Sequence, residues 1–361
     1  MRIGFAYNQR PDGVAPAFDA DGEASPPAPT PDAFAEWDEP ETIDAVENAL
    51  RAFGKVIRLE AVGDFAKRLQ RARVDLLFNM AEGLHGPARE AHVPAIAEFL
   101  GVPYTASDPL ALTLALHKGR AKEIWAYRGI PTAPFLLIES ADDLPRLRRM
   151  RRYPVFLKPV WEGSSKGIRQ ENYCRTAAQA VARARELLTE YREPVLAEAF
   201  LSGEEFTVSI LGNGDEADCL PLIRYRFEGL PKGALPIMGY EAKWVWDRPD
   251  QPLDILECPA QVPEAVEARV RETALAAYRA LGCRDWARVD LRLDGAGVPH
   301  VIEINPLPGI IPDLAANSCF PLAAATAGME YDELIQRVVG IAWRRLTGEE
   351  VRAATLTGAA G

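Results

Sequence analysis

Two strand-like segments near the C-terminus, joined by a short turn, constrain this chain more than any other feature. Residues 286–294 read WARVDLRLD and residues 300–305 read HVIEIN. The DGAG turn between them favours a hairpin, so we expect two antiparallel neighbours in one sheet. Because side chains alternate along a strand, Asp290 lies on one face of the first segment, and Glu303 and Asn305 share one face of the second.

Oxygen-bearing side chains that converge from neighbouring strands are typical of a Mg²⁺ site, where water and phosphate oxygens complete the coordination shell. The alternative is that both strands are half exposed and that the acids are merely hydrated. We favour the metal site because apolar residues flank all three side chains and Arg288 lies beside Asp290. The four histidines form no helical pair of the zinc-protease type, so any metal should have oxygen ligands.

The composition limits the class of protein. The chain has 361 residues, enough for two or three domains, with 48% hydrophobic and 26% charged residues. A net charge of −11 disfavours binding to nucleic acid or to an anionic membrane. No apolar run is long enough to span a membrane, and no signal peptide is recognisable. The five widely spaced cysteines predict reduced thiols and hence a cytoplasmic protein. With the acidic net charge, we expect neither nucleic-acid nor membrane partners.

Strand-like and helical segments alternate through most of the chain, which predicts an α/β architecture. The first 105 or so residues predict a parallel sheet, interrupted by a Pro- and Asp-rich loop at residues 8–40. We expect one helix at about 110–129, then a strand at 154–160, a Gly/Ser loop and a return strand at 168–172. Strands predominate beyond residue 205, with further helices at 263–281 and 331–346.

Three other segments carry polar residues that each allow two interpretations. Lys158 stands inside an apolar strand, where it needs an anion, and the EGSSKG loop after it suits either phosphate binding or a structural turn. Lys243 follows a Gly- and Pro-rich loop and is either a surface residue or part of a lid. Glu198 and Glu205 stand at the two ends of a turn, where they are either hydrated or bind a ribose or an adenine amino group.

Taken together, these stretches resemble the ATP-grasp superfamily and, within it, the D-alanine–D-alanine ligases. The resemblance runs in order from about residue 75 to 345 and is carried by GVPYTAS, the helix with Lys118, VFLKP, EGSSKG, EAFLSGEEFTVSIL, YEAK, LGCRDWARVDLRLD and EINPLPG. It implies an ATP-grasp fold with α+β lobes, preceded by an N-terminal Rossmann-like parallel-sheet domain. The implied parts are 1–109 for that domain, 110–204 for a central lobe with the phosphate loop, 205–346 for a C-terminal lobe with the metal site, and 347–361 for a frayed tail.

The resemblance also implies which residues bind ATP and Mg²⁺. Arg288 and the backbone N–H of Gly309 would form the oxyanion site, and Lys243 would meet the transferred phosphate near Ser164. Two Mg²⁺ ions are expected, with Mn²⁺ as a substitute. The ATP contacts would be Lys118, Lys158, Glu162, Ser164, Ser165, Glu198, Ala199, Leu201, Glu205 and Lys243, and the metal ligands Asp290, Glu303 and Asn305.

The implied reaction joins a carboxylate to an amine. Attack of the carboxylate on the γ-phosphate of ATP gives an acyl phosphate and releases ADP, and the amine then displaces phosphate to form an amide. Small carboxylates and amines of the amino-acid type are the expected substrates, and a homodimer through the N-terminal domain is the expected assembly.

Four residues depart from the family pattern and are our candidates for substrate contacts. AREA at 88–91 replaces a Gly-Glu-Asp-Gly turn, so Arg89 and Glu90 would serve a carboxylate and an amine. Trp244 replaces a phenol, and Asp313 stands where a serine would meet the second substrate's carboxylate, which favours a cationic or uncharged amine. The family's N-terminal loop, with a Glu that positions the first amino acid, has no recognisable counterpart. We therefore expect substrates other than two D-alanines; the alternatives are a genuine D-alanine–D-alanine ligase and a non-catalytic nucleotide-binding protein.

Overall fold

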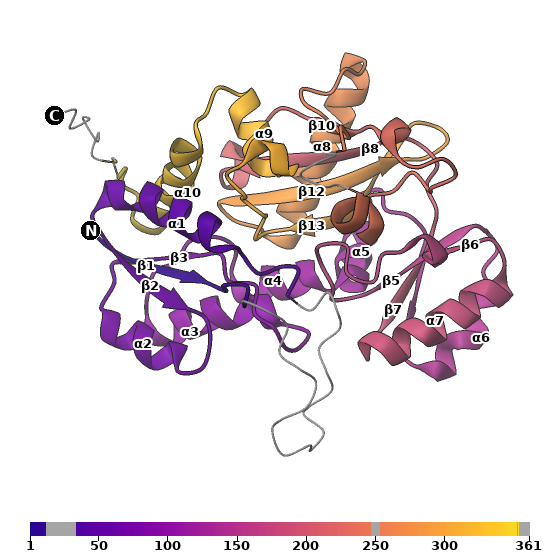
Figure 1. Cartoon of the computed structure of the whole chain (residues 1–361), viewed down its shortest axis with the longest axis horizontal. Helices are drawn as coiled ribbons and strands as arrows, with labels where there is room; N and C mark the ends of the chain where they lie inside the picture. The colour runs from indigo at the N-terminus through magenta and orange to yellow at the C-terminus, as the bar shows by residue number, and fades with distance from the viewer. Residues whose placement is uncertain (12–33, 247–252, 352, 354–361) are drawn as a thin grey trace.

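The computed structural model describes residues 1–11, 34–246, 253–351 and 353. Three sheets organise this part of the chain: one of three strands in the order β2-β1-β3, one of six built around β8, β12 and β13, and one of four in the order β4-β7-β5-β6. The first and the last lie on opposite sides of the molecule, with the six-stranded sheet above them and helices α4 and α5 between them, beneath that sheet (Figure 1).

The N-terminal sheet is parallel and comprises β1 (Arg2–Tyr7), β2 (Lys55–Glu60) and β3 (Leu76–Asn79). Alternate residues of β1 enter different cores. Ile3 and Phe5 pack with α1 (Pro40–Leu50) and the C-terminal helix α10 (Tyr331–Thr347), while Ala6 faces α2 (Phe65–Ala72) and α3 (His92–Leu100). The predicted parallel sheet is therefore confirmed, and helices from both ends of the chain cover it.

The six-stranded sheet contains the predicted hairpin. Strands β12 (Trp286–Leu293) and β13 (Pro299–Asn305) are antiparallel, with Asp290 opposite Glu303 and Arg288 opposite Asn305. Strand β8 (Glu205–Leu211) pairs with the other edge of β12, and α8 (Glu264–Leu281) packs on the sheet. Three short strands complete it: β9 (Asp218–Cys219), β10 (Ile223–Tyr225) and β11 (Leu256–Glu257).

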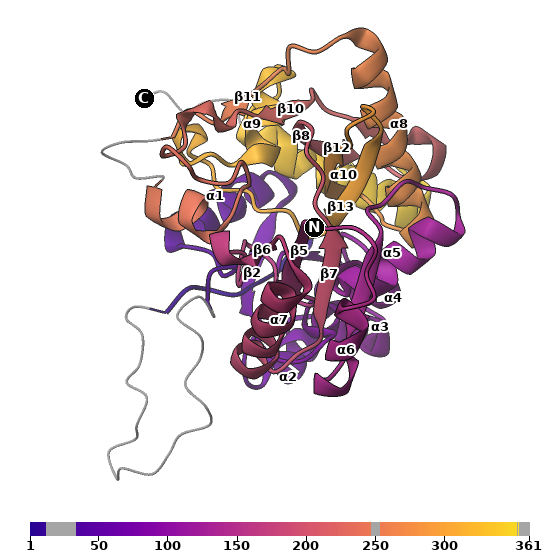
Figure 2. The ribbon, with the colours of Figure 1, turned by 90° about the vertical axis from the view of Figure 1, so that its right-hand side faces the viewer.

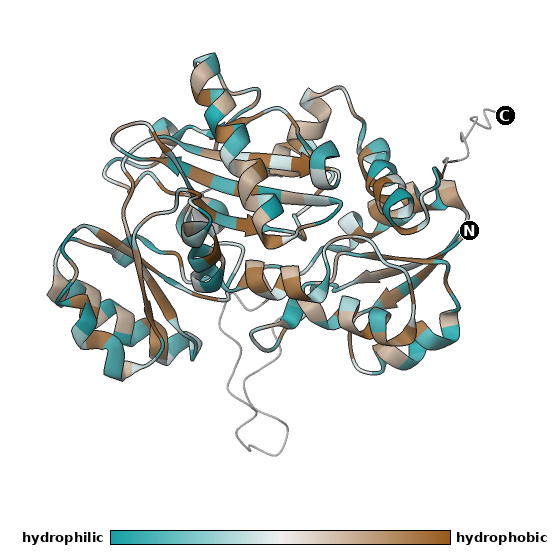
Figure 3. Cartoon of the chain, turned by 180° about the vertical axis from the view of Figure 1, so that it is seen from behind, coloured by the Kyte–Doolittle hydropathy of each residue, from teal (hydrophilic) through white to brown (hydrophobic). Residues whose placement is uncertain are grey.

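The four-stranded sheet separates an apolar face from a polar one. Its strands are β4 (Phe135–Ile138), β5 (Val155–Pro159), β6 (Tyr173–Cys174) and β7 (Val195–Ala199), and α6 (Leu144–Leu147) and α7 (Ala177–Tyr191) lie side by side against it (Figure 2). Val155 and Leu157 pack in the core beneath these helices, whereas Lys158 lines a cavity on the other side. Apolar residues accordingly concentrate on the strands and on the inner faces of the helices (Figure 3).

Two local predictions were wrong. The helix expected at 110–129 is two helices, α4 (Pro109–Leu116) and α5 (Lys118–Tyr127), because His117 leaves the helical conformation with ψ 85° and its ring caps α5 by accepting from the N–H of Arg120. The return strand expected at 168–172 is instead a turn, and β6 follows it. Helix α9 (Cys319–Thr326) was not predicted.

The break at His117 brings Lys118 to the start of α5, where its backbone N–H donates to Val160 O at 3.3 Å. Both α4 and α5 contribute to the core of the six-stranded sheet through Ala115, Ala121 and Trp125. The domain boundaries stay a prediction. No helix in the described ranges is long and apolar enough to cross a membrane.

Candidate active site

A cavity of about 220 Å³ lies between the four-stranded and the six-stranded sheet. Strands of both sheets, the EGSSKG loop, the loop before Lys243 and the segment 309–319 form its wall. The predicted residues that line it are Lys118, Lys158, Glu162, Ser164, Ser165, Glu198, Ala199, Leu201, Glu205, Lys243, Arg288, Asp290, Glu303 and Gly309. The structure thus brings together nearly all the residues predicted for nucleotide, metal and oxyanion binding.

The candidate metal site is a cross-strand pair of carboxylates. Asp290 accepts from the Thr207 hydroxyl at 2.5 Å and pairs with Arg288 at 2.9 Å, while Glu303 lies 3.4 Å from Lys118. Burial alone would raise the pKa of Glu303, but Lys118 and Lys158 outweigh it, so the pKa is lowered and the group is ionised. Asn305 ends β13, two residues after Glu303, and its side-chain oxygen accepts from the N–H of Leu307.

The described residues contain no cluster of three or more His, Cys, Asp or Glu side chains that could hold a metal ion. Asp290 and Glu303 line the cavity, whereas Asn305 does not. Two carboxylates do fit Mg²⁺, which uses one or two carboxylates and takes its other ligands from water and phosphate.

Glu198 is held between two buried lysines. Its carboxylate lies 2.7 Å from Lys158 and 2.7 Å from Lys122, which also donates to the Thr132 hydroxyl. Burial would raise the pKa of Glu198, but the two ammonium groups lower it to about 2. Lys122 was not predicted; its signal was a lysine one helical turn after Lys118.

Glu205 lies at the far end of the same wall. Its carboxylate pairs with Arg292 at 2.8 Å, and burial raises its pKa to about 7 although Arg292 opposes the shift. The guanidinium of Arg292 stacks over the Phe200 ring at 4.9 Å. Together with Phe156, Ala199 and Leu201, Phe200 gives this end of the cavity an apolar lining, which suits a planar base.

The EGSSKG loop and the loop before Lys243 contact each other across the cavity mouth. Ser164 and Ser165 both have left-handed backbones, with φ 47° and 61°. The Ser165 hydroxyl donates to Met238 O at 2.9 Å, the N–H of Tyr240 donates to Ile168 O, and the Lys243 ammonium donates to the Ser164 hydroxyl at 3.5 Å. This arrangement agrees with the lid interpretation of the segment before Lys243.

The end of the cavity formed by the segment 309–319 differs from our expectation for Asp313. Asp313 is exposed, and its carboxylate caps a short turn by accepting from Ala315 N at 2.9 Å. The lining residues there are Ser318 and Cys319, whose thiol lies 3.4 Å from the Tyr225 hydroxyl. After the turn at Leu314–Ala316 the chain returns to the cavity wall. A serine therefore lines the cavity, but it is Ser318 and not the residue at position 313. The predicted contact of Asp313 with substrate gains no support from this geometry.

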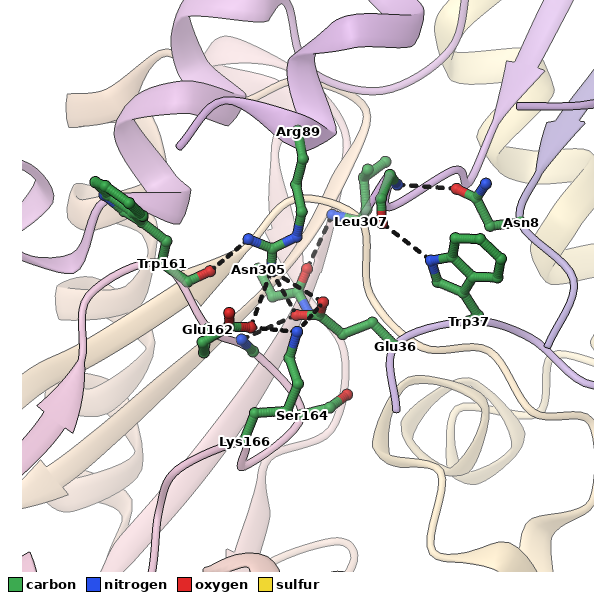
Figure 4. A network of polar contacts seen from close by, with 12 residues as sticks. Asn8, Glu36, Trp37, Arg89, Trp161, Glu162, Ser164, Lys166, Asn305 and Leu307 are labelled. Carbon is green, nitrogen blue, oxygen red and sulfur yellow. Dashed lines mark hydrogen bonds and ion pairs between the residues drawn. The ribbon is translucent and has the colours of Figure 1, made fainter. Parts of the chain in front are cut away.

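Arg89 and Glu90 are buried beside the EGSSKG loop but do not line the cavity. Arg89 donates to both oxygens of Glu36 at 2.9 Å and to Trp161 O at 2.8 Å (Figure 4). Burial raises the pKa of Glu90 to about 7. Their predicted substrate contacts stay predictions. Nothing in the sequence pointed to Glu36, which pairs with Arg89 and with Lys166 of the EGSSKG loop. The side chain of Trp244 is outside the described part of the structure.

A central sheet and a large sheet that enclose buried lysines, a carboxylate pair and a loop over the same cavity define a nucleotide-dependent ligase of the ATP-grasp class. The family model for the D-ala D-ala ligase C-terminus matches residues 124–340. The D-alanine–D-alanine ligase of Pelotomaculum thermopropionicum is 33% identical over 310 residues, which are 83% of this chain and 91% of that protein. The chain therefore belongs to the D-alanine–D-alanine ligase family and is an ATP-dependent ligase that forms carbon–nitrogen bonds, as its motifs indicated.

Two further similarities extend over almost the whole chain. The uncharacterized protein y4sG of Sinorhizobium fredii is 35% identical, with 97% of this chain and 99% of that protein aligned. The structure of D-alanine–D-alanine ligase from Bacillus anthracis complexed with ATP matches with a TM-score of 0.66 at 21% identity, covering 96% of this chain and 98% of that one. The second similarity confirms the predicted fold.

Proposed function

We propose that this protein is an ATP- and Mg²⁺-dependent ligase that joins an amino-acid-type carboxylate to an amine, with substrates other than two D-alanines. The observation that carries the proposal is the convergence of Lys118, Lys158, Lys243 and Arg288 on one cavity with the Asp290–Glu303 pair. With Arg292, five cationic side chains line this cavity. Ammonium and guanidinium groups in such numbers suit a ligand with several negative charges, such as a nucleoside triphosphate.

The residues of the cavity divide the reaction between them. The planar base would lie among Phe156, Ala199 and Leu201, and the lysines would hold the phosphates in line with the attacking carboxylate. Asp290, Glu303 and Asn305 would hold Mg²⁺, which offsets charge on the phosphate oxygens. Arg288 and the Gly309 N–H would stabilise the oxyanion when the amine attacks the acyl phosphate.

The substrate proposal rests on the departures of the sequence from the family pattern, at Arg89, Glu90 and Trp244 among others. A second candidate rests on the end of the cavity that holds Tyr225, Ser318 and Cys319. A thiol, a phenol and a hydroxyl form a small and uncharged surface there. The related protein from P. thermopropionicum is named as a D-alanine–D-alanine ligase, and the placement of Ser318 favours this activity as the second candidate. A homodimer, a cytoplasmic location and Mn²⁺ as a substitute ion complete the proposal.

The test is phosphate release from ATP by the purified protein with Mg²⁺ and a panel of amino-acid pairs, with the product identified by mass spectrometry. Release with a pair other than two D-alanines supports the proposal. Formation of D-alanyl-D-alanine from D-alanine as the preferred reaction would establish the second candidate instead. Nucleotide binding with no turnover across the panel contradicts both.

The metal assignment has its own test. Glu303→Gln keeps the shape of the side chain but removes the charge, so we expect kcat to fall by about 100-fold or more, because the γ-phosphate loses its counter-charge. The matched control is Glu264→Gln, an exposed acid at the start of α8 and outside the cavity, which should leave kcat unchanged. Equal activity of the Glu303→Gln variant and the wild type would refute this assignment.

A further inference from the structure

A second cluster of charged residues lies beside the cavity and joins the N-terminal part of the chain to the EGSSKG loop. Glu36 is at its centre (Figure 4). One carboxylate oxygen accepts from the backbone N–H of Gly163 at 2.9 Å, the other lies 2.7 Å from the Lys166 ammonium, and Arg89 donates to both. Three donors from two distant segments therefore hold one carboxylate.

The cluster is buried, and its positive and negative charges balance. The exposed side-chain fractions are 6% for Glu36, 4% for Arg89 and 5% for Lys166. Glu162, which also pairs with Lys166, supplies the second negative charge that balances the two cations. Breaking a buried ion pair by removing one partner is strongly destabilising, because it leaves an unpaired charge away from water. Lys166 and Glu36 therefore hold each other in place.

The loop that this cluster holds is strained. Consecutive left-handed residues are rare outside glycine, yet Ser164 and Ser165 both adopt this conformation and both line the cavity. Such strain persists only where the surroundings over-determine it. Gly163 and Lys166 flank the two serines on either side, and both are bonded to Glu36. A Cβ on Gly163 would lie 2.3 Å from the Glu36 carboxylate, so the approach is as close as a glycine permits.

We infer that Glu36, Arg89 and Lys166 form an ionic clamp that holds the EGSSKG loop in its strained conformation and presents Ser164 and Ser165 to the nucleotide phosphates. Glu36 and Lys166 are then positioning residues, since they act through the loop. Glu36 cannot also bind a substrate amine while both of its oxygens are occupied. The inference rests on the proposed function for the identity of the ligand, but the clamp itself is a property of the protein alone.

The first experiment compares wild-type protein with Lys166→Met, which keeps most of the length and removes the charge. Hydrogen exchange of the amides of residues 162–168 should accelerate by about tenfold or more without nucleotide, because the clamp no longer opposes loop opening. The KM for ATP should rise by about tenfold or more while kcat changes much less, because the loop must be ordered on each binding event. Lys166→Arg, which restores the charge, should recover most of both losses.

A double-mutant cycle separates the clamp from independent effects. If Glu36 and Lys166 act as one unit, Glu36→Gln with Lys166→Met should be no worse than the more severe single variant. Glu39→Gln is the matched control, because Glu39 is a neighbouring acid whose side chain is 56% exposed. It should leave both loop exchange and ATP affinity unchanged.

The outcomes are distinguishable from those for the proposed function. Unchanged loop exchange in Lys166→Met, with the thermal melt confirming a folded protein, would overturn the clamp whether or not ATP binds. Should Lys166→Met fail to fold, Glu36→Gln provides the same comparison. Faster loop exchange in Lys166→Met would support the clamp even if the wild-type protein binds no ATP in calorimetry. That second result would refute the nucleotide site alone.

Discussion

At the scale of single residues, several buried acids have protonation states set by burial more than by charge partners. Glu193 is 6% exposed, and one of its oxygens accepts from the N–H of Trp161 at 2.9 Å. Burial, and then the nearby Glu162, raise its pKa from 4.5 to about 8, although Lys118 and Arg89 act in the other direction. At neutral pH this side chain is therefore a neutral acid in the native protein.

The sign of the resulting pH dependence follows from proton uptake. The unfolded chain loses this proton near pH 4.5, whereas the native protein keeps it to about pH 8, so folding takes up a proton between these values. The stabilisation from the proton that native Glu193 retains is complete below pH 4.5. It is lost as the pH rises to 8, at up to about 1.4 kcal/mol per pH unit.

We predict that Glu193→Gln removes this contribution, because glutamine keeps the acceptor and does not titrate. The free energy of unfolding in urea should fall less steeply between pH 5 and 8 than in the wild type, by up to about 1 kcal/mol per pH unit. The control is Glu190→Gln, which changes an exposed acid in α7 and should keep the wild-type slope. Identical slopes for wild type and Glu193→Gln would show that the buried carboxyl does not titrate as described.

At the scale of elements, the end of the EGSSKG loop, which folds back against β5, depends on one glycine. Gly167 has φ 69°, and a Cβ there would lie 2.5 Å from the ring of Pro159, the last residue of β5. Its carbonyl accepts from the Asn172 side chain, which fixes the turn that leads into β6. Both the backbone conformation and the space require glycine.

We predict that Gly167→Ala destabilises the protein by about 2–4 kcal/mol, since a left-handed alanine and a steric clash act together. The control is Gly129→Ala, where φ is 72° but no atom lies within 4 Å of the added Cβ. It should cost only about 1–2 kcal/mol, the backbone part alone. Equal losses in chemical denaturation would mean that the contact with Pro159 relaxes without cost.

At the scale of the whole molecule, one buried aspartate connects three separate parts of the chain. Asp285 is fully buried before β12 and accepts from the N–H of Ala106 and from the side chain of Asn213. Arg345 of α10 pairs with both of its oxygens, at 2.9 and 2.8 Å, and also donates to Tyr104 O. This cluster and the core shared by β1, α1, α10 and Trp286 tie the C-terminal helix to the N-terminal sheet.

We predict that Arg345→Met lowers the free energy of unfolding by about 3–5 kcal/mol, because Asp285 remains buried and charged without its cation. The chain supplies a matched control in Arg344, the preceding residue, which pairs with Glu216 where both side chains are more than half exposed. Arg344→Met should cost at most about 1 kcal/mol. A loss of similar size in both variants would argue that burial of the pair adds nothing.

The sequence by itself determined the parts that depend on local periodicity and on residue order. The DGAG turn predicted the β12–β13 hairpin, and alternation with period two predicted that Asp290 and Glu303 would converge from it. The ordered motifs predicted the family and most of the charged residues that line the cavity. These features could be predicted because a strand fixes the direction of each side chain within a few residues.

Only the tertiary structure decided the contacts between segments that are distant in sequence. Glu36 reaches Lys166, Lys122 reaches Glu198, and Ser318 lines the cavity whereas Asp313 does not. The break at His117 depends likewise on the packing of α4 and α5, and the nearby Gly119 lies inside α5 and not at the break itself. An ion pair across a fold leaves no periodic trace in the sequence, since any acid can pair with any base that the chain path brings near. The path of the backbone therefore selects which charges become a site.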